Sequence, residues 1–142
     1  MASIFIQILD GKIPGHFVWE DEHCFSIMTI QPIREGHLLV IPKLEVNHWD
    51  EVPADIAAHL MKVSQLIAKA IKAVVNCARV GVSIIGLEVP HTHIHLIPID
   101  TMSDMSFAGA HDVPSEHLAE MASIIKANLI GTGHAEANIR KR

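Results

Sequence analysis

The sequence predicts an α+β domain, with a mostly antiparallel sheet of about five strands and two helices. Three observations carry this prediction. A length of 142 residues corresponds to one domain. Hydrophobic residues make up 49% and charged residues 19% of the chain, which supplies the apolar surface of an ordinary globular core. Short apolar runs surround two longer segments with helical periodicity, and the resulting order of strands, helix, two strands and helix is typical of this fold class.

The N-terminal part of the chain contains four runs that predict strands. The first is the short apolar run Ile4–Leu9. Two further runs, residues 17–20 and 24–30, flank Asp21-Glu22-His23, which is typical of a hairpin connection. Residues 32–36 predict a turn, and the fourth run follows at residues 37–42.

Two segments predict helices. In residues 53–76 apolar side chains recur every three or four positions and charged ones fall on the opposite side, after a possible cap at Asp50. Residues 115–129 repeat the pattern, with Ser115 as a cap and Gly131 beyond the end. Between the helices, residues 80–86 and 91–98 predict two strands. The apolar stripes are Ile56, Leu60, Val63, Ile67, Ile71 and Val74 in the first helix, and Leu118, Met121, Ile125 and Leu129 in the second.

Charge and cysteine content exclude several classes of protein. The net charge is −5 and the single basic cluster is residues 140–142, so we expect no nucleic-acid partner. Cys24 and Cys77 are too few for a disulfide framework or a four-cysteine zinc site, and indicate a reducing compartment. The start of the chain lacks the cationic lead of a signal peptide, and no apolar run reaches the roughly 18 residues of a membrane span. We therefore expect a cytoplasmic protein without a membrane partner.

Histidine is the unusual residue, with 11 copies, and three of them alternate in Pro-His-Thr-His-Ile-His-Leu-Ile-Pro at residues 90–98. Strand alternation places His91, His93 and His95 on one face and apolar neighbours on the other, so we expect one face to be buried and the imidazoles to be open. A solvated face does not need three histidines. We therefore interpret this run as functional.

The spacing on a strand favours nucleophilic chemistry over metal binding. Residues i and i+2 lie about 6.8 Å apart, so His91 and His95 would be about 13.6 Å apart. An HxH pair could bind zinc at about 2.0–2.1 Å, but all three imidazoles could not bind one ion. A neutral His93 between two imidazoles could instead attack phosphorus, while its neighbours stabilise the developing charge. Phosphoryl or nucleotidyl transfer, nucleotide binding with little turnover, and metal binding by an HxH pair all remain open.

Three motifs then resemble the histidine-triad (HIT) family: His91-Thr92-His93-Ile94-His95-Leu96-Ile97, Gly36-His37-Leu38-Leu39-Val40-Ile41-Pro42-Lys43 and Gly11-Lys12-Ile13-Pro14. The resemblance covers about residues 3–107, so the predicted domain is 3–107 with a helical extension at 108–142. It implies a homodimer with a continuous sheet and action at a nucleotide α-phosphate, on purine phosphoramidates or dinucleoside polyphosphates. It implies a nucleotidyl-histidine intermediate on His93 and no cofactor.

The resemblance also assigns the remaining site residues. His91 and His95 take orienting and phosphate-contact roles beside His93. The nucleotide-binding positions fall on Thr29, Ile30, Glu88 and His95, with Thr29 where the family has a ribose-binding Asp or Asn. We interpret His37 as a structural residue and His16 as a surface residue.

The chain departs from the family pattern at charged positions. Glu45 stands where many members have a fourth active-site histidine, and Glu88 replaces a small hydroxyl residue that could assist the leaving group. Two carboxylates facing a phosphate would repel it, so we expect at least one to turn away, to pair with a cation or a backbone donor, or to protonate the leaving group. Some members bind zinc through Cys-x-x-Cys, and those positions are Ser3 and Ile6 here, so we expect no metal. The sequence resembles a divergent bacterial-type branch.

Overall fold

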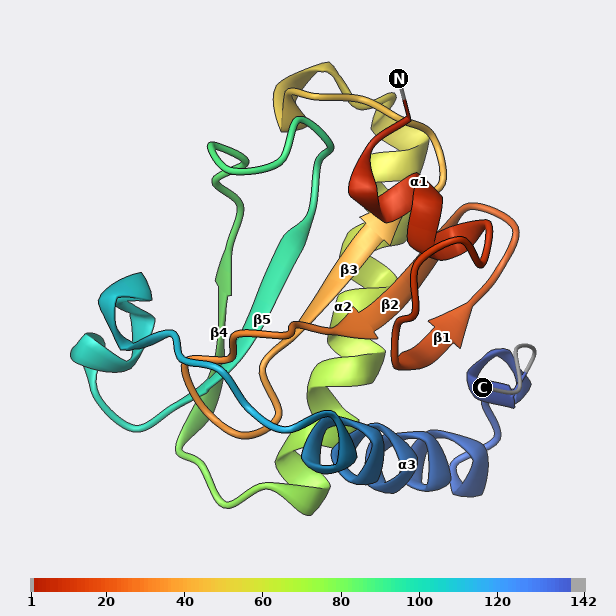
Figure 1. Ribbon diagram of the computed structural model, residues 1–142. Coiled ribbons are helices and arrows are strands. Elements are labelled where there is room, and N and C mark those ends of the chain that lie inside the picture. Colours follow the sequence, from red (N-terminus) through yellow and green to blue (C-terminus); the bar gives the residue numbers. More distant parts are fainter. Residues whose placement is uncertain (1, 139–142) are drawn as a thin grey trace.

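The computed structural model describes residues 2–138, so the basic cluster at residues 140–142 lies outside the described residues. A five-stranded antiparallel sheet in the order β1-β2-β3-β5-β4 forms the centre of the molecule (Figure 1). This confirms the predicted fold class. The strands are β1 (Phe17–Glu20), β2 (Cys24–Met28), β3 (Leu38–Pro42), β4 (Arg79–Ser83) and β5 (Ile94–Ile99). The helices are α1 (Ile4–Leu9), α2 (Ala54–Val74) and α3 (Ser115–Gly131). Short 3-10 turns are η1 (Trp49–Glu51), η2 (Met102–Met105), η3 (Phe107–Gly109) and η4 (Ala135–Asn138).

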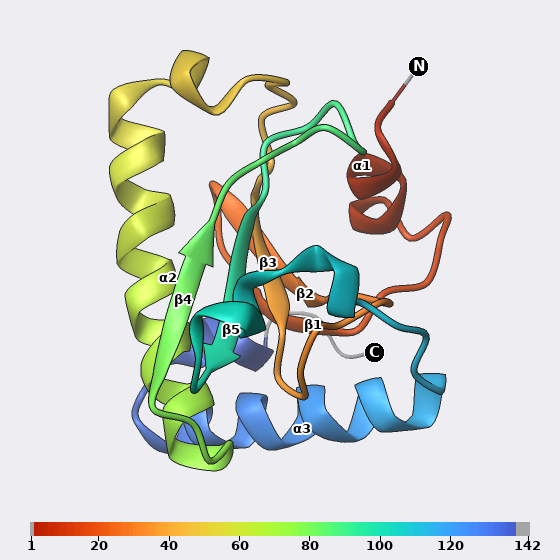
Figure 2. The ribbon, with the colours of Figure 1, turned by 90° about the vertical axis from the view of Figure 1, so that its left-hand side faces the viewer.

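The two faces of the sheet bury different partners. Figure 2 shows α2 along one face and α1 on the opposite side, with α3 crossing below the sheet. Alternation along β3 divides the residues, since Leu38 and Val40 pack towards α2 and α3 while Leu39 and Ile41 pack towards α1. Leu96 of β5 belongs to the α2 side, so His95 beside it faces the α1 side. The strand alternation therefore sends an imidazole to the face that α1 covers.

The prediction of a first strand at Ile4–Leu9 is wrong, because this run forms the short helix α1. The Ser3 hydroxyl accepts a hydrogen bond from the Ile6 amide at 3.2 Å and caps the helix start. Phe5 and Ile8 lie one turn apart and are both buried against the sheet. A continuous apolar run of six residues does not distinguish strand from helix, and the cap together with this shared face favours the helix.

Both long helices lie where they were predicted, and both contribute to one core. The predicted caps are wrong, because Pro53 and Pro114 precede the helices in place of Asp50 and Ser115, and Gly131 is the last residue of α3. Ile67 of α2 and Ile125 of α3 are fully buried in the same cluster as Leu96. The segment after residue 107 therefore packs on the sheet, while the domain boundary at 107/108 stays a prediction. None of the helices within residues 2–138 is long and apolar enough to cross a membrane.

The histidine run enters its strand later than predicted. β5 begins at Ile94 rather than at residue 91. The His91 amide donates to the Val89 carbonyl at 2.8 Å, and the Thr92 amide donates to the Val46 carbonyl at 2.7 Å. These bonds curve the chain ahead of β5, so His91 and His93 lie on a bend rather than on a straight strand.

Candidate active site

A cleft of about 450 Å³ opens on the α1 side of the sheet. Glu88, His93 and His95 form its polar end, and Phe5, Ile8, Ile27 and Leu39 are among its apolar walls. This volume and this mixture of a mostly apolar lining with a few polar groups are typical of small-molecule sites. Five of the six residues assigned from the sequence line it: Thr29, Ile30, Glu88, His93 and His95. His91 does not belong to the lining.

The three imidazoles are buried, which corrects the expectation of an open face. The exposed fractions are 0% for His91, 1% for His93 and 5% for His95. Phe5 covers His91 and His93 with ring centroids at 5.7 and 5.0 Å, and Phe107 covers His95 at 4.7 Å. The alternating pattern could not show these covers, because Phe5 comes from α1 and Phe107 from the turn after β5.

His91 is fixed from both sides and holds the next histidine. Its Nε2 donates to the Pro42 carbonyl at 2.8 Å, so Nδ1 of the neutral ring accepts from the Ser3 hydroxyl at 2.7 Å. Burial lowers the pKa of His91 below its usual value, and the repulsive charge of His93 adds to this effect, which outweighs the Pro42 bond and Glu45. The His91 backbone carbonyl in turn lies 2.7 Å from His93 Nδ1.

That last contact decides which nitrogen of His93 is reactive. A carbonyl oxygen only accepts, so His93 Nδ1 carries a proton. In the neutral ring, Nε2 then holds a lone pair, and the ring belongs to the lining of the cleft. Such an imidazole nitrogen is a competent nucleophile.

His95 presents the opposite chemistry through a chain that begins at a backbone amide. The Ile33 amide donates to His37 Nδ1 at 3.0 Å, so neutral His37 donates through Nε2 to His95 Nδ1 at 3.0 Å. His95 Nε2 therefore carries a proton, and it has no hydrogen-bond partner among the described residues. Burial lowers the pKa of His37 to about 3 and that of His95 to about 4, helped by repulsion from the next imidazole in each case, so both rings are neutral at pH 7.

His37 is thus a positioning residue that sequence reasoning missed. It is 1% exposed and reaches His95 across a separation of 58 residues. The available signal was its position at the start of the strand that pairs with β5, where Leu39 lies opposite His95. An inward histidine beside the histidine run was a candidate partner for it.

Glu88 contacts the reactive nitrogen. Its Oε1 lies 3.2 Å from His93 Nε2 and 3.9 Å from His95 Nε2. Burial raises the pKa of Glu88, but bonds from its own backbone amide and from His93, with the charges of both imidazoles, outweigh this and lower the pKa overall. The carboxyl group is therefore ionised when the cleft holds no anion.

Glu45 confirms the expectation that one of the two carboxylates avoids the cleft. It accepts a hydrogen bond from the Ser3 backbone amide at 3.2 Å and does not line the cleft. Ser3, at the first position of the family's Cys-x-x-Cys, contacts Glu45 and His91 beside α1, and Ile6 at the second position offers no ligand atom. A zinc ion does not fit this donor set, since thiolates are absent from it and His91 Nδ1 already accepts from Ser3.

Two described groups of side chains have ligand atoms within 4.8 Å of one another. In the first group, Asp21 accepts from Trp19 at 2.8 Å, from His59 at 2.7 Å and from the Cys24 thiol at 3.5 Å, and also from two backbone amides. This carboxylate is already saturated and holds the hairpin. The second group is Glu88, His93 and His95, where the Nε2–H of His95 offers no lone pair to a metal.

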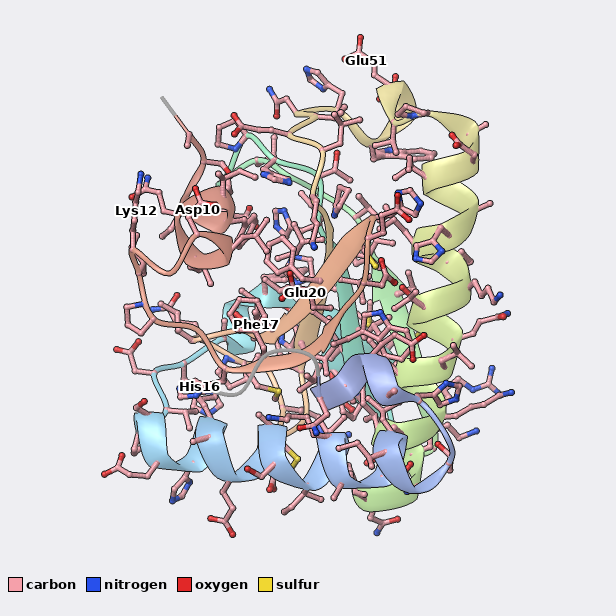
Figure 3. All side chains as sticks on the ribbon, turned by 90° about the vertical axis from the view of Figure 1, so that its right-hand side faces the viewer. Asp10, Lys12, His16, Phe17, Glu20 and Glu51 are labelled. Carbon is pink, nitrogen blue, oxygen red and sulfur yellow. The ribbon has the colours of Figure 1, made fainter. Side chains whose placement is uncertain are left out.

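The far end of the cleft is closed by the segment before and inside α3. Ser115 and Leu118 line it, and His16 Nε2 lies 3.1 Å from Ser115 Oγ. Figure 3 shows His16 beside α3. His16 therefore lies at the rim of the cleft rather than on an unrelated surface. Thr29 lines the cleft nearby, and Ile30 is 71% exposed at its edge.

The fold and the cleft together define an α+β protein whose buried imidazoles end in an apolar pocket. The family model of the HIT domain matches residues 10–102, so the chain belongs to the HIT family. It is 34% identical over 99 residues to an uncharacterized HIT-like protein of Methanocaldococcus jannaschii, covering 67% of this chain and 77% of that one.

A second relative has a named activity. The chain is 34% identical over 98 residues to adenosine 5'-monophosphoramidase HNT1 of Saccharomyces cerevisiae, covering 68% of this chain and 62% of the yeast protein. Among solved structures, a zinc-bound histidine triad family protein from Mycobacterium smegmatis is similar with a TM-score of 0.80 and 27% identity, over 96% of this chain and 99% of that chain. Hydrolases are thus among the relatives of this chain.

Proposed function

We propose that this protein is a nucleotide hydrolase or nucleotidyltransferase that acts at the α-phosphate through a nucleotidyl intermediate on His93. The observation that carries the proposal is the pairing of opposite functions in one cleft. When its ring is neutral, His93 supplies a lone pair on Nε2, and His95 Nε2–H supplies an unused donor. The two imidazole centroids are 5.0 Å apart, so one phosphoryl group could contact both.

The rest of the cleft suits a nucleotide. Its apolar walls would take the base, and Thr29 and Ile30 at the edge would contact the sugar. His91 would act by holding the Nδ1–H of His93, since it does not line the cleft. The yeast relative named as a phosphoramidase supports a phosphorus–nitrogen bond as one candidate target.

The test is release of AMP from adenosine 5'-phosphoramidate. We expect wild-type turnover, loss of turnover by at least about 1,000-fold in His93→Ala, and unchanged turnover in His117→Ala, which removes an exposed histidine. His93→Ala should still bind AMP, because the walls and His95 remain. Wild-type binding without turnover would instead identify a nucleotide-binding module. A stoichiometric metal in untagged protein would favour the metal-binding alternative.

We also propose a homodimer formed through α2 and the β4 edge. In the described structure β4 is the last strand of the sheet and pairs only with β5, and Val82 in β4 and Ile85 just after it are 47% and 45% exposed. Open strand edges of this kind favour pairing with another chain. Light scattering should give twice the 15.6 kDa chain mass, and a mass of 15.6 kDa at micromolar concentration would contradict the dimer. A cytoplasmic location remains a proposal that rests on the two free cysteines.

A further inference from the structure

Glu88 is the group in the cleft that the proposed chemistry leaves without a role. We propose that Glu88 and His93 share one proton, that Glu88 delivers it to the leaving group, and that its charge selects nucleotides with an amine leaving group over polyphosphates. This inference rests on the proposed function, because it assumes attack by His93. It names the substrate class of the same site.

The hydrogen bonds require the shared proton. His93 Nδ1 already has its proton on the His91 carbonyl, so the 3.2 Å contact between His93 Nε2 and Glu88 Oε1 holds one further proton. While that proton is on Nε2, His93 cannot attack. The lone pair becomes available when the proton moves to Glu88, which makes the nucleophile and the acid in the same transfer.

Substrate binding favours this transfer and also sets the preference for the leaving group. No lysine or arginine is present among the described lining residues, so Glu88 is the dominant charge there before substrate binds. A bound substrate would exclude water from the contact between Glu88 and His93, and desolvation favours the neutral pair, with the proton on Glu88, over the ion pair. A polyphosphate leaving group would bring further negative charge to the same carboxylate, whereas a neutral amine would bring none.

The steps balance with water as the single co-reactant. The His93 Nε2 lone pair forms a bond to phosphorus while the phosphorus–nitrogen bond breaks, and the leaving nitrogen takes the proton from the Glu88 carboxyl group. Water then attacks phosphorus, gives its proton to the Glu88 carboxylate, and the Nε2–phosphorus bonding pair returns to His93. The products are a nucleoside monophosphate and an amine, and Glu88 and His93 again share one proton.

The loop that carries Glu88 allows substrate to enter this position. The Glu88 side chain is 58% exposed and Leu87 beside it is 91% exposed, so the carboxylate can move towards solvent. Thr92 anchors the end of the loop to the Val46 carbonyl at 2.7 and 2.8 Å. The acid is thus movable while the histidines behind it stay fixed.

The experiment compares leaving groups in wild type, Glu88→Gln and Glu22→Gln. Glu22→Gln is the matched control, since it removes the same charge from an exposed hairpin residue. The substrates are adenosine 5'-phosphoramidates of increasingly basic amines, adenosine 5'-(4-nitrophenyl phosphate), whose leaving group needs no proton, and a diadenosine polyphosphate. We expect Glu88→Gln to slow basic amines by about 100-fold or more and the nitrophenyl ester by less than about threefold. The KM for the polyphosphate should fall in the same variant.

Two results would overturn the role of Glu88: equal slowing of every substrate in Glu88→Gln, or faster wild-type cleavage of the polyphosphate than of the amines. Failure of the proposed function is a separate result. It is nitrophenyl ester turnover that persists in His93→Ala, or is absent from wild type. If ester turnover depends on His93 but Glu88→Gln slows all leaving groups equally, the proposed function is retained and the role of Glu88 alone is rejected.

Discussion

This molecule contains two clusters of hydrogen-bonded histidines, and the imidazoles have different roles in the two clusters. The site cluster consists of His37, His91, His93 and His95. Its hydrogen bonds begin at backbone groups and end at Nε2 atoms of two rings that line the cleft. The consequence is one lone pair and one N–H donor held at a place where a ligand could meet them.

The hairpin cluster consists of Asp21, Cys24 and His59, and it ends on a carboxylate. Asp21 accepts from side chains on β1, β2 and α2 and from two turn amides, so the donors around it converge on one saturated group. Burial, followed by the charge of Asp21, raises the pKa of the Cys24 thiol, which keeps it protonated. Buried histidines can therefore meet a ligand where their network ends at an open atom, as in His95, or at a movable partner, as in His93, and they stabilise the fold where the network closes on a saturated group.

The largest expected difference between the two clusters is in how the free energy of unfolding depends on pH. His37 and His95 have pKa values of about 3 and 4 in the folded protein and about 6.5 when unfolded, so the unfolded chain binds more protons between these values. Their contribution to stability is complete above pH 6.5 and is lost as the pH falls towards 4, by about 3 kcal/mol for each ring. Urea unfolding from pH 7 to pH 4 measures this loss.

Asp21 should respond in a lower window. The opposing effect of burial is outweighed by hydrogen bonds, which hold the pKa of Asp21 at about 2, so its contribution is present above about pH 4 and is lost as the pH falls towards 2. His37→Leu should therefore flatten the stability profile between pH 6.5 and 4, whereas His117→Ala should leave it unchanged. An identical slope in His37→Leu would contradict the neutral buried ring.

Breaking the chain behind His95 should cost activity rather than only stability. In His37→Ala, His95 loses the donor that fixes its tautomer, so we expect kcat to fall by about 100-fold, or about 2.7 kcal/mol in activation free energy. His59→Ala is the matched variant from the hairpin cluster and should leave kcat unchanged per folded molecule. Steady-state kinetics on the nitrophenyl ester measures both, and a kcat loss in His59→Ala equal to that in His37→Ala would abolish the distinction between the clusters.

The sequence was sufficient for the elements whose pattern is local. The helical periods of α2 and α3 and the hairpin of β1 and β2 follow from spacing and turn residues. The run at Ile4–Leu9 was misinterpreted because six consecutive apolar residues have no distinguishing period. Ser3 immediately before that run was the overlooked signal of a helix cap.

The candidate site could be located from the sequence but not assembled from it. The alternation of His91, His93 and His95 marked the position, and Glu88 was identified as a departure close by. The bonds that decide protonation join residues 58 and 88 positions apart, between His37 and His95 and between Ser3 and His91. No local pattern encodes such contacts, so the burial of the imidazoles and their tautomers depended on the tertiary structure.

Removing the centre of the hairpin cluster should have the opposite effect to the one expected for His37→Ala. Asp21→Ala leaves the Trp19 indole and the His59 ring without an acceptor, so we expect a loss of about 2 kcal/mol in the free energy of unfolding. The kcat of the folded protein should be retained. Urea unfolding with parallel kinetics provides the measurement, and a stable variant with low kcat would show that this cluster serves the site.

The smallest effect is expected at Ser3, which links α1 to the site cluster. Ser3→Ala removes the cap of α1 and the donor to His91 Nδ1, so we expect the free energy of unfolding to fall by about 1 kcal/mol and kcat to fall about tenfold.

Ser3→Thr keeps the hydroxyl group and should restore most of both quantities. Thermal unfolding and kinetics of the two variants give the comparison. Equal activity of Ser3→Ala and wild type would show that the Pro42 carbonyl alone orients His91.

In the proposed reaction, His93 Nε2 faces the α-phosphate of a bound nucleotide. A crystal structure with AMP tests it most directly. We predict phosphorus at about 3–3.5 Å from His93 Nε2, with one phosphate oxygen accepting from His95 Nε2–H and Glu88 displaced from its 3.2 Å contact. A phosphate bound away from His93, with the contact between Glu88 and His93 intact, would contradict nucleophilic attack by His93.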